Sequence, residues 1–163
     1  MKKQKYSLGF TLIELIVVIS IISILIGIIT TNLLNSRQKA SSNSTVTSLV
    51  ADINQHQIKA MTGETEVTGV IVNKGVYFEP TRYTLFSGSQ YNPQDQGNFI
   101  VPLDDALQFT SITFPNSTIL FASVSGEIVG FQNGANSISI RNTLSNEQKT
   151  IQMNRYGVIT QIQ

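Results

Sequence analysis

The chain has 163 residues, no cysteine and a formal net charge of +1, with eleven Lys and Arg against ten Asp and Glu. The absence of cysteine excludes disulfides and thiolate metal sites. Lys2, Lys3 and Lys5 all precede Gly9, so the rest of the chain is slightly acidic. This argues against a fixed nucleic-acid partner, because binding to phosphates requires clustered Lys and Arg.

Segment 10–34 is strongly apolar, and residues 10–29 contain one charged side chain, Glu14. A helix of about 20 residues spans the roughly 30 Å of a bilayer's hydrocarbon core. A buried helix of this length would normally have a polar face, and this segment has none. The lysines before it predict a cytoplasmic N-terminus. We therefore predict a single-pass helix in the cytoplasmic (inner) membrane, with the part of the chain that follows it outside the cytoplasm.

A cleaved secretory signal peptide is the alternative interpretation of this segment. The apolar run is longer than an ordinary signal-peptide core, and no Ala-x-Ala-like cleavage site follows it. The polar residues 35–45 have the character of a continued helix instead. The membrane helix is therefore favoured.

Glu14 is unusual because a carboxylate near the membrane interior is costly and normally has a partner. One interpretation is that the side chain reaches back to the interface from its place near the helix end. The other requires a cut between Gly9 and Phe10, which would create a new α-amino group. The Glu14 of one helix could then meet the amine of a neighbouring copy, and this pairing would lower the cost of both charges.

The stretch "KYSLGFTLIELIVVISIISIL" resembles the class III signal of type IV prepilins and pseudopilins, over roughly residues 5–30. The resemblance implies that a prepilin peptidase removes the leader 1–9 and N-methylates Phe10. It also implies that Glu14 guides assembly with other pilin or pseudopilin subunits. Many family members carry a proline further along the mature helix, where the helix can melt on assembly. This chain has Thr31 at that position, so the resemblance does not extend to local melting.

Residues 35–62 are predicted to continue the helix and to pack on a sheet, with Gly63 as the stop signal. His56, the single histidine, is interpreted as a helix-surface or packing residue rather than a metal ligand. The stripe that would pack on the sheet consists of Val46, Leu49, Val50, Ile53 and Ala60. Polar residues expected on other faces are Asn54, Gln55 and Gln57.

Residues 63–163 read as short strands and turns, which predicts an antiparallel β-rich head. Two strands are expected within 66–80, separated by a hairpin turn at 73–75. An exposed loop is expected at 88–98, and turns at 142–148 and 156–157. Further strands are expected within 81–88, 107–115, 118–131, 136–143 and 149–163. The predicted fold is α+β and pilin-like: a long N-terminal helix, transmembrane in its first half, packed on this head.

The head resembles that of the GspH/FimT-type minor pseudopilins. The resemblance is carried by "GVYFEPTRYTLFSG", "ITFPNSTILFASVSGEIV", "SISIRNTL" and "TIQMNRYGVITQI". These proteins typically close with Gly-Arg and a hydrophobic residue, whereas this chain has Gly157, Val158 and Ile159, with Arg155 two residues before the glycine. The resemblance implies a structural minor subunit of a type IV pilus or a type II secretion pseudopilus.

Catalysis and metal binding are not predicted. Asp104 and Asp105 form an acidic pair, but calcium takes six to eight oxygen ligands. The pair is expected to cap a short helical turn or to be solvated. A Ser-His-Asp hydrolase is disfavoured because His56 lies within the predicted helix and no nucleophile-elbow motif is present. No cofactor is expected.

DNA binding by the head is the alternative function, because some FimT-like relatives take up DNA through basic residues. Arg141, Lys149 and Arg155 could line one face of the C-terminal strands. Three positive charges would give only modest, salt-sensitive affinity. Scattered charges on sheet edges are the favoured interpretation, since edge strands commonly carry Lys and Arg.

Overall fold

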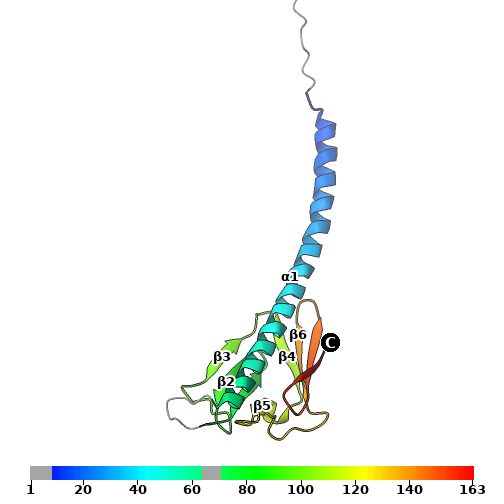
Figure 1. Ribbon diagram of the computed structural model, residues 1–163. Helices are drawn as coiled ribbons and strands as arrows, with labels where there is room; N and C mark the ends of the chain where they lie inside the picture. The colour runs from blue at the N-terminus through cyan, green and yellow to red at the C-terminus, as the bar shows by residue number, and fades with distance from the viewer. Residues whose placement is uncertain (1–8, 64–70) are drawn as a thin grey trace, which may run out of the picture. The chain divides into compact units, whose positions relative to one another are not determined.

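The computed structural model describes residues 9–63 and 71–163, with only the backbone described for residues 30–35, 37 and 38. The chain forms two compact units, Met1–Arg37 and Gln38–Gln163. A single helix, α1 (Leu12–Thr62), belongs to both and covers the two helical segments that the sequence predicts. With two antiparallel sheets beside it, the chain has the predicted α+β, pilin-like architecture (Figure 1).

In the first unit, α1 contains one segment long and apolar enough to cross a membrane. It runs from Leu12 to Ile29 with a mean hydropathy of 3.0, and none of its residues is buried. The hydroxyls of Ser20 and Ser23 donate to the carbonyls of Ile16 and Ile19, each at 2.8 Å. These polar groups are thus satisfied within the helix, as the interior of a bilayer requires.

In the second unit, the C-terminal part of α1 buries the predicted apolar stripe. Leu49, Ile53 and Ala60 are fully buried, and Val46 is nearly so. The helix ends at Thr62, where Gly63 takes a left-handed conformation (φ 65°) and its N–H donates to the carbonyl of Ala60. A glycine in this conformation is a common C-terminal cap, so both the stripe and the stop signal are confirmed.

The first sheet has four antiparallel strands in the order β3-β2-β1-β5. These are β1 (Lys74–Glu79), β2 (Arg82–Ser87), β3 (Phe99–Pro102) and β5 (Thr118–Phe121). The side chains of Val76, Ile119 and Phe121 are fully buried in the core that includes Leu49 and Ile53. Since successive side chains point to opposite faces, Tyr77, Thr118 and Leu120 lie on the other face of this sheet.

The second sheet has the antiparallel order β4-β6-β7-β8, and a 3₁₀ turn η1 (Pro115–Ser117) connects β4 to β5. Its strands are β4 (Leu107–Ile112), β6 (Ser137–Asn142), β7 (Gln148–Met153) and β8 (Ile159–Ile162). Ile138, Ile151 and Met153 join the same core cluster as the helix and the first sheet. One hydrophobic core therefore supports the whole head.

The predicted hairpin turn at 73–75 is wrong. Lys74 and Gly75 lie inside β1, which pairs with β2 on one side and β5 on the other. Glycine at position 75 allows the ring of Phe86 to pack directly against the backbone of β1. A Cβ at this position would lie 2.3 Å from Cζ of Phe86. Glycine within a strand often marks such contact rather than a turn. The first predicted strand falls mainly on residues 64–70, outside the described residues, and residues 71–73 form no strand.

Three further details differ from the sequence-based expectations. Strand β3 was not predicted, because it is a four-residue, largely exposed edge strand that ends in Pro102. The strand expected within 118–131 ends at Phe121 and is followed by an isolated bridge between Phe121 and Ile128. Asp104 and Asp105 are both exposed, which agrees with the expectation of a solvated pair. The alternative of a cap is wrong, because the two residues begin a non-helical turn in which the N–H of Leu107 donates to the carbonyl of Asp104 at 2.8 Å.

Candidate processing and assembly site

Gly9 and Phe10 lie just before α1 and are open to solvent. Neither belongs to a helix or strand, and Phe10 is 85% exposed. No heavy atom of the described residues would lie within 4 Å of a Cβ at Gly9. The peptide bond between these residues is therefore accessible, as a cut at this position requires.

Thr11 and Glu14 form a reciprocal cap at the start of the helix. The carboxylate of Glu14 accepts hydrogen bonds from the backbone N–H of Thr11 at 2.9 Å and from its hydroxyl at 2.8 Å. In return, the Thr11 hydroxyl oxygen accepts from the N–H of Glu14 at 3.3 Å. This is the capping-box arrangement, with Glu14 in the first helical turn. The sequence analysis missed it, although the Thr-x-x-Glu spacing is its signal.

Glu14 shares a face of the helix with apolar side chains near the candidate cleavage point. A shallow hollow on this face is bordered by Phe10, Ile13, Glu14, Val17 and Val18. The three-and-four-residue spacing of Phe10, Glu14 and Val17 is that of neighbours on one helical face. Glu14 is thus the one charged group among the residues that border this hollow, and it lies four residues after Phe10 in the sequence.

The polar residues of the C-terminal part of α1 bind the helix to the sheet. His56 is buried, and its Nε2 lies 3.0 Å from the carbonyl oxygen of Phe86. Burial, reinforced by the charges of Lys74 and Lys59, lowers the pKa of His56, although the Phe86 hydrogen bond and Asp52 oppose the shift. The ring is therefore a neutral packing group rather than an exposed ligand.

Two further side-chain contacts attach this part of the helix to the head. The hydroxyl of Tyr83 donates to the carboxylate of Asp52 at 2.5 Å, and burial followed by this hydrogen bond raises the pKa of Tyr83. The amide of Gln57 donates to the carbonyls of Gly126 at 2.9 Å and Tyr156 at 2.6 Å. Gln57 thus ties the helix to two loops of the head.

The three basic residues considered for DNA binding do not lie together on one face. Arg141 pairs with Gln148 across β6 and β7, whereas Lys149 pairs with the buried Ile140, so alternation places the two cations on opposite faces. Arg141 donates to the side chain of Asn146 at 2.6 Å. Arg155 lies in the turn after β7 and forms an ion pair with Glu127 at 3.0 Å. This register argues against the single basic face that was considered as the alternative to scattered charges.

The part of the chain that the structure describes contains no group of three or more His, Cys, Asp or Glu residues that could hold a metal ion. Asp104, one residue of the acidic pair considered for calcium, has another partner: its carboxylate accepts a hydrogen bond from the hydroxyl of Ser41 on α1. That contact makes Asp104 part of the connection between helix and head.

Comparison with known proteins gives one family motif and one partial match. The family described as "Prokaryotic N-terminal methylation motif" matches residues 4–30. A type II secretion system core protein G of Vibrio cholerae serotype O1 is 43% identical over 51 residues, which cover 31% of this chain and 35% of that protein. No solved structure matches the chain. The similarity to known proteins is therefore confined to short segments, and this chain spans about a third of the length of the secretion protein that it matches.

Proposed function

We propose that this chain is a structural subunit of a type IV pilus or a type II secretion pseudopilus. In this proposal a prepilin peptidase removes residues 1–9 and methylates the new N-terminus at Phe10. The observation that carries the proposal is the match to the N-terminal methylation motif over residues 4–30. It is supported by the exposed Gly9–Phe10 bond at the start of an apolar helix.

Glu14 is the proposed assembly residue. It is the single charged side chain of the apolar segment and lies on the same face as Phe10. A carboxylate in this environment is costly unless a positive group or hydrogen-bond donors satisfy it. In the isolated chain Thr11 supplies the donors. In a filament the amine of a neighbouring subunit's Phe10 would supply a positive charge, which is the stronger partner for a carboxylate.

The proposed location follows from the same segment. The helix would be anchored in the cytoplasmic membrane with the head outside the cytoplasm, and assembly would move the helix into the filament. We further propose a minor subunit, because the head sequence resembles the GspH/FimT-type proteins. Its role would be structural rather than enzymatic: the polar residues of the helix, His56 and Gln57, are engaged in packing and in carbonyl hydrogen bonds.

The test is the mass and N-terminal sequence of the protein after co-expression with a prepilin peptidase. We expect a mature chain that begins at methylated Phe10. The matched control, Gly9→Val, places a branched side chain at the cleavage point without changing the helix and should remain uncut. An intact wild-type chain, or a cut elsewhere, would reject the proposal.

DNA binding by the head is the alternative, and the head gives it less support. Arg155 is paired with Glu127, and Arg141 and Lys149 lie on opposite faces of the sheet. A binding titration with double-stranded DNA at two salt concentrations separates the two functions. Salt-dependent binding that is lost in Arg141→Gln, Lys149→Gln and Arg155→Gln variants would favour the alternative.

A further inference from the structure

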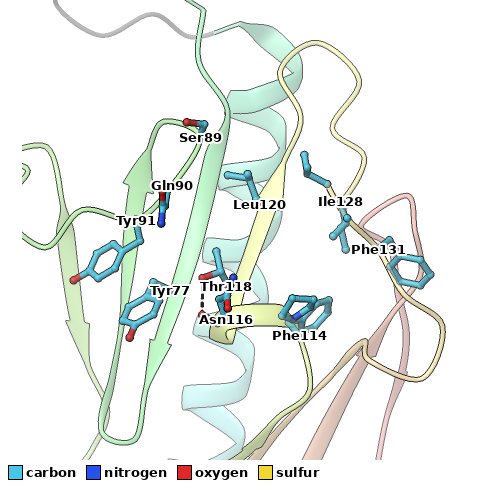
Figure 2. A pocket seen from close by; sticks show the side chains of 13 residues that line it. Tyr77, Ser89, Gln90, Tyr91, Phe114, Asn116, Thr118, Leu120, Ile128 and Phe131 are labelled. Atoms are coloured by element: carbon cyan, nitrogen blue, oxygen red, sulfur yellow. Dashed lines mark hydrogen bonds between the residues drawn. The ribbon is translucent and has the colours of Figure 1, made fainter.

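A cavity of about 400 Å³ lies on the face of the first sheet opposite the core (Figure 2). Its floor is formed by Tyr77, Thr118 and Leu120. One wall comes from the loop after β2, at residues 89–91, and the other from η1 and the loop at 128–131. Pockets of roughly 300–1,000 Å³ with apolar walls and a few polar groups are typical ligand sites. Neither the processing site nor the assembly helix uses this cavity.

Aromatic rings form a fixed surface along one wall. Tyr77 and Tyr91 stack with ring centroids 4.1 Å apart and planes 13° from parallel. The ring of Phe86 packs edge-on against Tyr91 at 5.6 Å and is itself 2% exposed, so the stack rests on a buried ring of the same sheet face. Phe114 and Phe131 lie across the cavity in Figure 2. A flat ligand would therefore meet rings that are already in place.

The polar groups of the cavity are neutral. Among the described residues that line it, none is charged. The side chains of Ser89, Gln90 and Asn116 are exposed and make no hydrogen bond to any described residue, so their donors and acceptors are open to a ligand. Asn116 (φ 53°) and the following Ser117 (φ 52°) are both left-handed. Such uncommon backbone conformations cluster at ligand sites.

These features select against several classes of ligand. Phosphate groups, nucleic acids and metal ions are usually bound with the help of charged side chains, and the described residues that line the cavity include none. Addition of a peptide strand to the edge of β5 is blocked, because the N–H of Val129 already donates to the carbonyl of Leu120 at 2.8 Å. What remains is a neutral ligand with an apolar flat face and several hydroxyl or amide groups.

We propose that this cavity binds a neutral saccharide. The C–H face of a sugar ring would lie against the stacked Tyr77 and Tyr91, and its hydroxyls would bond to the side chains of Gln90 and Asn116. The head would meet such sugars outside the cytoplasm. Only this location of the head is taken from the proposed function. Binding to the purified chain does not depend on processing or assembly, so the two proposals fail independently.

The test uses the full chain in a detergent without a sugar headgroup, titrated with neutral oligosaccharides built from glucose, galactose or N-acetylglucosamine. Binding is measured by calorimetry and by saturation transfer from protein to sugar protons. We expect at least one sugar to bind, and Gln90→Ala and Val129→Glu to weaken it at least tenfold. Both positions are exposed, so these variants should fold.

Two controls make the result specific. Tyr156→Ala removes an exposed aromatic side chain outside the cavity and should leave binding unchanged. Asn116→Gly removes the amide while tolerating the left-handed backbone, and should weaken binding as Gln90→Ala does. Failure of every sugar to bind, equal binding of acidic sugars or DNA, or a Val129→Glu variant that binds normally would overturn the proposal. Self-association abolished by Val129→Glu, without sugar binding, would assign the cavity to a protein contact instead.

Discussion

The carboxylate of Glu14 is held by its own chain, through the N–H and the hydroxyl of Thr11 at 2.9 and 2.8 Å. The isolated subunit therefore does not carry an unsatisfied carboxylate at the start of its membrane segment. A partner from a neighbouring subunit would have to replace hydrogen bonds that already exist. An ionised amine can do so, because it adds the attraction between two opposite charges, which is strong where the surroundings have a low dielectric constant.

The first prediction concerns Glu14→Ala. Membrane insertion should be unchanged or improved, because removing a carboxylate lowers the free energy of transfer into the bilayer. Incorporation into filaments should fall on the order of tenfold, the equivalent of about 1.4 kcal/mol. The measurement compares the protein in sheared filaments with that in membranes. Ile13→Ala, on the same face, is the control, and normal incorporation of Glu14→Ala would contradict the assembly role.

The second prediction concerns Thr11→Val, which keeps the shape of the side chain and removes its hydroxyl. The helix loses its N-cap acceptor and Glu14 loses one donor, a change typically worth about 0.5–2 kcal/mol. We expect less protein in the membrane fraction, while the filament share of the inserted protein stays the same. Thr11→Ser should restore insertion. A defect in filament entry alone would show that Thr11 acts on assembly rather than as a cap.

The third prediction concerns Gly75→Ala in β1. The new methyl group would lie 2.3 Å from Cζ and 2.5 Å from Cε1 of Phe86, and that ring is held under Tyr91. Overpacking of this kind typically destabilises by about 1–3 kcal/mol. Chemical denaturation of the full chain in detergent, followed by tyrosine circular dichroism, measures the change. Ser111→Ala on an exposed strand position should have little effect, and Phe86→Leu should partly rescue Gly75→Ala.

The sequence predicted those features that depend on local pattern. The apolar segment and the stripe of Leu49 and Ile53 both follow from helical periodicity, and Gly63 ends the helix as a glycine should. Gly75 was misread because its role depends on Phe86, which reaches it only when β1 and β2 pair. A glycine after Asn73 and Lys74 has the same local sequence signature whether it forms a turn or makes room for an aromatic ring.

The cavity on the outer face of the first sheet could not be predicted for a related reason. Tyr77, Tyr91, Asn116 and Phe131 come from four separate segments of the chain and meet only in the folded head. Residues this far apart in the sequence form no local pattern from which their proximity could be predicted. The Thr11–Glu14 cap is the opposite case, because its Thr-x-x-Glu signal is local and present in the sequence.

The last prediction concerns pH and His56. A carbonyl oxygen only accepts hydrogen bonds, so the contact with Phe86 requires the proton on Nε2, and the ring is neutral when Nδ1 is bare. Its pKa is lowered by burial first, and by Lys74 and Lys59, from the ordinary value of 6.5. Below that value the unfolded chain binds a proton that the folded head resists, so the free energy of unfolding falls as pH falls.

The free energy of unfolding should fall by up to about 1.4 kcal/mol per pH unit, which is the slope for one proton. The fall should stop below the pKa that His56 has in the folded head. Denaturation of the full chain between pH 7.5 and pH 5 should show this loss, in the window that opens below pH 6.5. His56→Gln keeps an N–H for the Phe86 carbonyl and does not titrate, so its stability should change less with pH. If His56→Gln and wild type lose stability in parallel, the pH dependence belongs to other groups, and the folded head binds a proton at His56 as readily as the unfolded chain does.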